Sequence, residues 1–168
     1  MVSTTSRPEG VRPTPAFMLA HPAHLLAMGF GTGLSPVAPG TVGTLLAIPF
    51  YAVLLQHFSP LEVLALCVLL FSTGIWACDR TGRDLGVADH GCMTWDEIVA
   101  FLAVLTFLPT TWQAQTAAFV LFRLFDVLKP APLRWLEKRF EGGIGVMLDD
   151  LGAAFFTLLV LALATVLF

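Results

Sequence analysis

Two adjacent pairs of acidic residues each stand directly before an apolar stretch. Asp96 and Glu97 precede one such stretch, and Asp149 and Asp150 precede the last one of the chain. A single acid in a first helical turn is explained by the helix dipole, which favours negative charge at the amino end. Two pairs are more than the helix dipole requires. Carboxylates beside apolar segments are also costly unless a cation or a partner neutralises them. The pairs therefore predict a cation-binding site.

Further charged residues lie in the same polar segments. Asp89 precedes the first acid pair, and Arg123, Asp126 and Lys129 follow one another at intervals of three residues. On a helix this spacing places the last three in one sector of the surface, and Pro130 predicts that the helix ends near Lys129. The pattern has two interpretations. It is an ordinary intrahelical ion pair, or it is a carboxylate ligand flanked by cations that contact phosphate.

A glycine-rich segment at 29–43 contains Gly40, Thr41 and Gly43 at the start of another apolar stretch. Backbone N–H groups at a helix start can bind phosphate. The segment is not a Walker A loop, because no Gly-Lys-Ser/Thr follows it. The spacing of its small residues equally fits tight packing between helices. Both interpretations remain open from the sequence.

Carboxylate oxygens are the ligands that Mg²⁺ prefers, with water and substrate phosphate at the remaining positions. Such an ion neutralises a phosphoryl group and lowers the pKa of an attacking water. We expect Asp149, Asp150 and Asp96 to be the first ligands, and Glu97 to be a ligand or the base. The full candidate set comprises Asp89, Asp96, Glu97, Asp126, Asp149 and Asp150 as catalytic acids, all but Asp89 also as metal ligands, and Gly40, Thr41, Gly43, Arg123 and Lys129 as phosphate ligands.

The polar segments 29–43, 79–97 and 123–150 are separated by apolar stretches whose composition and lack of alternation favour helices. These stretches are 42–55, 63–78, 98–122 with a break at Pro109, and 151–168. The first two stretches, and the two halves of the third, predict two antiparallel hairpins. The hairpins return all three polar segments to one end. The expected fold is an all-α, compact multi-helix bundle with polar clusters at that end.

The composition favours association with a membrane. Hydrophobic residues make up 57% of the chain and charged residues 12%, about half the charged fraction of an ordinary soluble domain. A very apolar soluble core is the alternative. None of the nine Lys and Arg residues lies at a hairpin tip, so the positive-inside rule places the polar end in the cytoplasm. Because a spanning helix needs about 20 apolar residues, the shorter stretch 98–108 is expected to be re-entrant or buried.

Other features narrow the class of protein. Residues 1–16 lack an apolar core, so we expect a flexible N-terminal tail and a single domain over 17–168. Cys67, Cys78 and Cys92 lack CxxC spacing, which predicts free thiols in a reducing compartment. No basic run or aromatic-basic pattern is present, and nucleic-acid binding is set aside.

The polar segments, taken in order, resemble the phosphatidylglycerophosphatase A family. The matching stretches are GFGTGLSPVAPGTVGTLLAIP, DLGVADHG, TWDEIVAF, FRLFDVLKPAPLRW and GGIGVMLDDLGAA, between about His21 and Leu159. The resemblance implies a helical bundle at the cytoplasmic face of the bacterial inner membrane. It also implies hydrolysis of phosphatidylglycerophosphate to phosphatidylglycerol and inorganic phosphate with Mg²⁺.

The resemblance carries over to individual residues of this chain. Some relatives have an acid after the DHG turn where this chain has Cys92, so no role for an acid transfers there. An ion-coupled transporter is the alternative function, because acids at membrane depth also mark ion pathways, and a non-catalytic membrane scaffold is a third. The motif acids are Asp84, Asp89, Asp96, Glu97, Asp126, Asp149 and Asp150, and the motif cations are Arg123 and Lys129.

Overall fold

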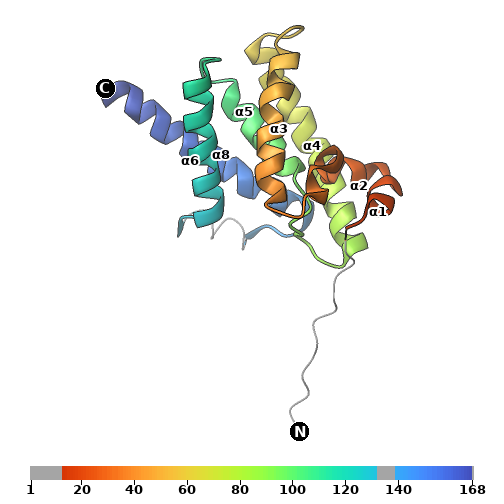
Figure 1. The fold of residues 1–168 in the computed structure, drawn as a ribbon. Helices are drawn as coiled ribbons and strands as arrows, with labels where there is room; N and C mark the ends of the chain where they lie inside the picture. The colour runs from red at the N-terminus through yellow and green to blue at the C-terminus, as the bar shows by residue number, and fades with distance from the viewer. Residues whose placement is uncertain (1–12, 132–138, 168) are drawn as a thin grey trace.

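The computed structural model describes residues 13–131 and 139–167, and every regular element within them is helical. Residues 1–12 of the expected tail, and 132–138 in the third polar segment, lie outside the described residues. The described chain confirms the all-α class. The elements are α1 (Pro15–Leu19), α2 (Pro22–Ala27), the 3-10 helix η1 (Gly29–Leu34), α3 (Pro39–Leu54), α4 (Pro60–Leu85), α5 (Trp95–Leu105), α6 (Trp112–Leu128) and α8 (Gly142–Leu167) (Figure 1).

Local signals explain where α4 begins and ends. Ser59 and Glu62 form a capping box at its start, in which the Glu62 carboxylate accepts the Ser59 backbone N–H at 2.8 Å. Gly86 ends the helix in the left-handed region, with φ 72°. The helix therefore runs past Cys78, where the predicted apolar stretch stopped, and includes the first residues of the second polar segment.

The start of α8 differs from the expectation. The acid pair Asp149-Asp150 was expected to begin the last helix, but α8 begins at Gly142 and the pair lies in its third turn. Gly143 lies inside the helix, where the absence of a side chain allows close packing against α4. A Cβ at Gly143 would lie 2.0 Å from the carbonyl oxygen of Ile75 on α4.

Two antiparallel helical hairpins build the bundle, as predicted. Figure 1 shows the tips of α3–α4 and α5–α6 at the top of the view, while the start of α3, the start of α5 and the end of α6 lie at the bottom. The start of α8 lies at this lower end as well. The three polar segments therefore meet at one end of the molecule.

The short helix α5 is the centre of the bundle. It packs against α3, α4, α6 and α8, and almost every one of its residues is buried. Its length is only about 16 Å at 1.5 Å per residue. The segment that was too short to span a bilayer is thus buried against other helices, one of the two arrangements expected for it.

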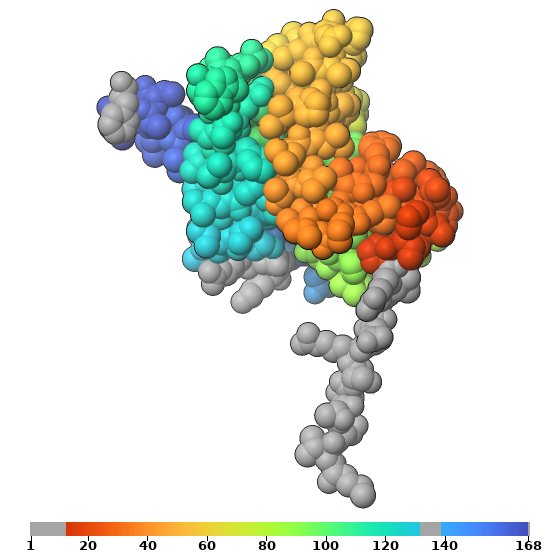
Figure 2. Space-filling model, viewed as in Figure 1, coloured from red at the N-terminus to blue at the C-terminus, as the bar shows by residue number. Residues whose placement is uncertain are grey.

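Two helices, α4 and α8, are long and apolar enough to cross a membrane by length and composition. Large apolar side chains on both remain exposed, among them Val68 and Leu69 on α4 and Phe155 and Leu163 on α8. Figures 1 and 2 show the C-terminal half of α8 projecting from the body of the molecule. This exposure supports association with a membrane. Cys67, Cys78 and Cys92 are buried free thiols, as predicted.

Candidate functional site

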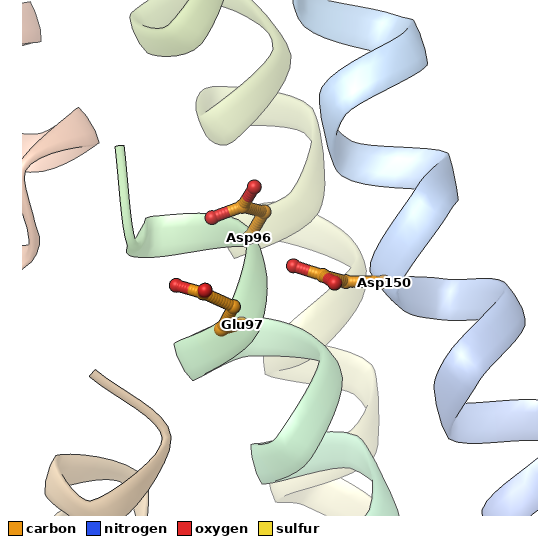
Figure 3. Close-up of side chains that lie close together, drawn as sticks. All are labelled: Asp96, Glu97 and Asp150. Carbon is orange, nitrogen blue, oxygen red and sulfur yellow. The ribbon is translucent and has the colours of Figure 1, made fainter. Parts of the chain in front are cut away.

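Three carboxylates converge at the polar end of the bundle. Asp96 and Glu97 lie in the first turn of α5, and Asp150 reaches them from α8 (Figure 3). One oxygen of each lies within 4.8 Å of an oxygen of both others. Asp96 is 7% exposed and Asp150 4%. We call Asp96, Glu97 and Asp150 the carboxylate group.

The carboxylate group has the properties of a cation site. Oδ1 of Asp96 and Oε2 of Glu97 are buried and have no hydrogen-bond partner among the described residues. Burial, together with the charges of Glu97 and Asp89, raises the pKa of Asp96 well above its usual value. Burial also raises the pKa of Glu97 to about 8, although Arg123 opposes the shift. A bound cation would relieve this concentration of negative charge.

Arg123, on α6, contacts side chains of α3 and α5 as well as one on its own helix. Its Nη1 donates to Glu97 Oε1 at 3.2 Å, to Asp126 Oδ2 at 2.8 Å and to Thr44 Oγ1 at 3.5 Å. The predicted intrahelical pair with Asp126 is therefore present, and the same guanidinium also positions a member of the carboxylate group. Sequence reasoning did not identify Thr44 as a residue of the site. Its only signal was a spacing of four residues from Gly40, which places both on one face of a helix.

Lys129 connects α6 to α8 through an ion pair with Asp149. It is the C-terminal cap of α6, with φ 41°, and Pro130 follows it, so the helix ends where the sequence predicted. Asp149 was expected to be a first metal ligand. It is oriented toward Lys129, whereas its neighbour Asp150 enters the carboxylate group. Consecutive side chains on a helix point about 100° apart, so Asp149 and Asp150 have different partners here.

The predicted glycine segment lies against the site. A Cβ at Gly40 would be 1.8 Å from Glu97 Oε1, and one at Gly43 would be 2.9 Å from Thr94 Cβ. These glycines therefore allow close packing of α3 on α5, which was one of the two interpretations. Thr41 lies in the first turn of α3. The amino end of α3 is beside Glu97, so an anion at the site would also meet this end of the helix.

Asp89 and Asp84 have different surroundings. Asp89 lines a hollow of about 390 Å³ with Asp149 and Glu141, and its charge acts on both Asp96 and Glu97. Asp84 lies 2.9 Å from Nε2 of His24 and accepts from Arg80 Nε at 2.8 Å. The structure thus brings Asp89 to the site. It places Asp84 in a link between α2 and α4 outside the carboxylate group.

A helical bundle with two long apolar helices, and with carboxylates and cations gathered at one end, is the arrangement expected of a membrane-associated protein with a polar reaction site. The sequence profile of the Phosphatidylglycerophosphatase A family matches residues 25–165. The chain belongs to this family and is a phosphoric monoester hydrolase. Membership confirms the motif resemblance. It favours an enzyme over the transporter and the scaffold that the sequence left open.

Curated relatives are similar over most of their length. The chain is 46% identical to Phosphatidylglycerophosphatase A of Escherichia coli (strain K12) over 137 residues, 80% of this chain and 78% of the relative. It is 42% identical to the protein of the same name from Haemophilus influenzae over 149 residues, 88% of this chain and 91% of the relative. A Bacteroides thetaiotaomicron protein, provisionally named a phosphatidylinositol-3-phosphatase, is 39% identical over 148 residues, 83% and 91% of the two chains. No solved structure matches the chain.

Proposed function

We propose that this protein hydrolyses phosphatidylglycerophosphate to phosphatidylglycerol and inorganic phosphate in bacterial phospholipid synthesis, and that it uses Mg²⁺. The names of the Escherichia coli and Haemophilus influenzae relatives support this substrate. The observation that carries the reaction is the carboxylate group, which is buried beside an arginine and a lysine. Such a site can hold a cation and a phosphate together.

Asp96, Glu97 and Asp150 would hold the ion. Their oxygens lie close enough together to share one cation, and two of these oxygens are buried without a hydrogen-bond partner among the described residues. The six candidate acids outnumber Arg123 and Lys129, the two candidate cations. When bound, Mg²⁺ supplies charge neutralisation at the phosphoryl group and a lower pKa for the attacking water.

Arg123 and Lys129 would bind the phosphate of the substrate. A guanidinium carries several N–H donors in a planar fork. Arg123 can therefore hold Glu97 with one nitrogen and donate to a phosphate oxygen with others. Lys129 supplies a mobile positive charge between α6 and α8. Gly40, Thr41 and Gly43 contribute the amino end of α3, which lies beside Arg123 and Glu97.

Asp89 is the carboxylate that we assign as the base. It lines the hollow of about 390 Å³, and its charge acts on both Asp96 and Glu97. Water attacks phosphorus and gives a proton to Asp89, and the bond between phosphorus and the glycerol oxygen breaks. The same proton is returned to that glycerol oxygen, so the products are an alcohol and inorganic phosphate.

The bilayer would hold the rest of the lipid. The described basic residues Arg80, Arg83, Arg123, Lys129 and Arg139 belong to the polar end, away from the hairpin tips. By the positive-inside rule this end faces the cytoplasm at the inner membrane. The headgroup then enters the carboxylate group from the cytoplasmic side, while the lipid tails remain beside the apolar helices.

The test compares three lipids with the purified protein: phosphatidylglycerophosphate, phosphatidic acid and phosphatidylinositol 3-phosphate, each with Mg²⁺ and with excess chelator. We expect phosphate release from the first lipid with Mg²⁺ and none with chelator. Asp150→Asn should abolish release, whereas Asp84→Asn, which removes an acid outside the carboxylate group, should retain it. Release that persists in chelator would contradict the metal assignment. A preference for either other lipid would contradict the substrate assignment.

A further inference from the structure

A narrow apolar groove of about 200 Å³ lies between α4, α5 and α8. Its lining is hydrocarbon apart from one thiol, which behaves as a small apolar group. No charged side chain lines it. The residues that matter here are Cys67, Val68 and Phe71 from α4, Val99 and Ala103 from α5, and Leu151 from α8.

The groove begins next to the carboxylate group. Val99 follows Asp96 by three residues on α5, which places the two on the same face about 4.5 Å apart along the helix. Leu151 directly follows Asp150 on α8. Figure 3 shows Asp96 and Asp150 approaching each other from these two helices. Two walls of the groove are therefore continuous with two of the three carboxylate positions.

Two other apolar hollows differ from the groove in position. One, of about 260 Å³, lies between η1, α3 and α5. It reaches the first turn of α5 through Trp95 and Ile98, but no residue of α4 or α8 lines it. The other, of about 570 Å³, lies between the α5–α6 tip and the part of α8 that starts at Phe155. Phe155 is five residues beyond Asp150, or about 7.5 Å farther along the helix. Neither hollow adjoins both the acids of α5 and Asp150 of α8.

The groove opens outward on the two helices that are long and apolar enough to cross a membrane. At its rim Val68 is 64% exposed and Leu151 41%. A protein helix is about 10 Å wide, which is much wider than a single hydrocarbon chain. The apolar lining suits part of one such chain, and the rest of the chain would extend into the bilayer. An occupant that is apolar at one end and reaches the carboxylates at the other is a lipid with a phosphorylated headgroup.

We propose that this groove binds one acyl chain of the phospholipid whose phosphate is hydrolysed at the carboxylate group. The inference rests on the proposed function and adds a binding site for the tail of the substrate. An acyl chain gains little by leaving the bilayer, because both surroundings are apolar. The groove therefore acts by orientation: a chain held beside Val99 and Leu151 fixes how far the headgroup extends toward Asp96 and Asp150.

The test narrows the groove with Val68→Trp and compares it with Leu69→Trp. The two residues are adjacent on α4 and both 64% exposed, but only Val68 lines the groove. Phosphate release is measured in detergent micelles of fixed composition, with dipalmitoyl and dibutanoyl phosphatidylglycerophosphate. We expect Val68→Trp to lower kcat/KM about tenfold for the long-chain lipid, because the headgroup is misplaced. The short-chain lipid should be unaffected, and Leu69→Trp should affect neither.

A second variant, Ala103→Val, narrows the groove from the opposite wall. It should also lower kcat/KM for the long-chain lipid more than for the short-chain lipid. Equal effects of Val68→Trp and Leu69→Trp would overturn the proposal, as would an equal loss for both lipids in Val68→Trp. Equal kcat/KM of the unaltered protein for both lipids would overturn the proposed binding of an acyl chain in the groove and leave the proposed function standing. Absence of phosphate release from both lipids would overturn the proposed function, and the inference with it.

Discussion

Replacement of Gly40 by alanine tests how closely α3 must approach the carboxylate group. A Cβ at this position would lie 1.8 Å from Oε1 of Glu97 and 3.2 Å from Nη1 of Arg123. Real Cβ atoms do not approach other heavy atoms within 3.0 Å, so the Glu97 carboxylate must move by at least 1.2 Å, the difference between 3.0 and 1.8 Å. Gly40→Ala should therefore displace Glu97, a proposed metal ligand, and leave its carboxylate chemically unchanged.

The size of the effect follows from that displacement. A shift of about 1 Å in a reacting group can cost roughly a hundredfold in rate, or about 2.7 kcal/mol of activation free energy. Stability should change less. The displaced atom ends a side chain, and overpacking of this kind costs about 1–3 kcal/mol. We expect kcat to fall about a hundredfold in a protein that remains folded.

The assay is magnesium-dependent phosphate release, with thermal unfolding of each variant measured in parallel. Gly91→Ala is the matched control, because a Cβ at Gly91 meets nothing within 4 Å. It should keep both activity and stability. A kcat for Gly40→Ala within about twofold of the unaltered protein, with normal folding, would refute the placement of Glu97 in the reaction site.

Three further predictions follow from contacts around the site. Mg²⁺ should raise the Tm of the unaltered protein but not that of Asp150→Asn, because the variant loses a buried ligand; equal shifts would contradict the ligand assignment. Arg123→Lys should lower kcat/KM roughly 10- to 100-fold, because a shorter set of ammonium donors cannot keep the contacts of Nη1 to Glu97 and Asp126 and also reach phosphate; normal kinetics would show that these contacts are dispensable. His24→Ala should destabilise the protein by about 1–3 kcal/mol in urea unfolding, because a buried hydrogen-bonded ring is lost. Its kcat should be unchanged, and a lower kcat with normal stability would place His24 in the reaction.

The arrangement of the polar segments could be predicted because it depends on hairpin topology alone. Breaks at Pro109 and near Ser59 divide the apolar stretches, and antiparallel neighbours return to the same end. The start of α8 was not predictable in the same way. A run of glycines normally indicates a loop, whereas here Gly143 lies inside a helix, at a point where α4 is too close for any side chain.

The composition of the site was predictable, but the direction of each side chain was not. Whether Asp149 or Asp150 joins the carboxylate group depends on the rotation of α8 about its axis, and that rotation could not be predicted from the sequence. The reach of Arg123 to Glu97 depends on how α5 and α6 are aligned, which only their packing sets. Asp84 shares a motif with Asp89, yet a partner on α2 holds it outside the carboxylate group.

The order of the helices along the chain has a consequence for biosynthesis. Asp96 and Glu97 belong to α5, but the third carboxylate arrives with α8, which follows α5 by 37 residues along the chain, from Leu105 to Gly142. A chain that terminates before Asp150 has two of the three acids and therefore an incomplete cation site. Chains cut short in this way would be inert toward lipid, because α5 alone cannot complete the site.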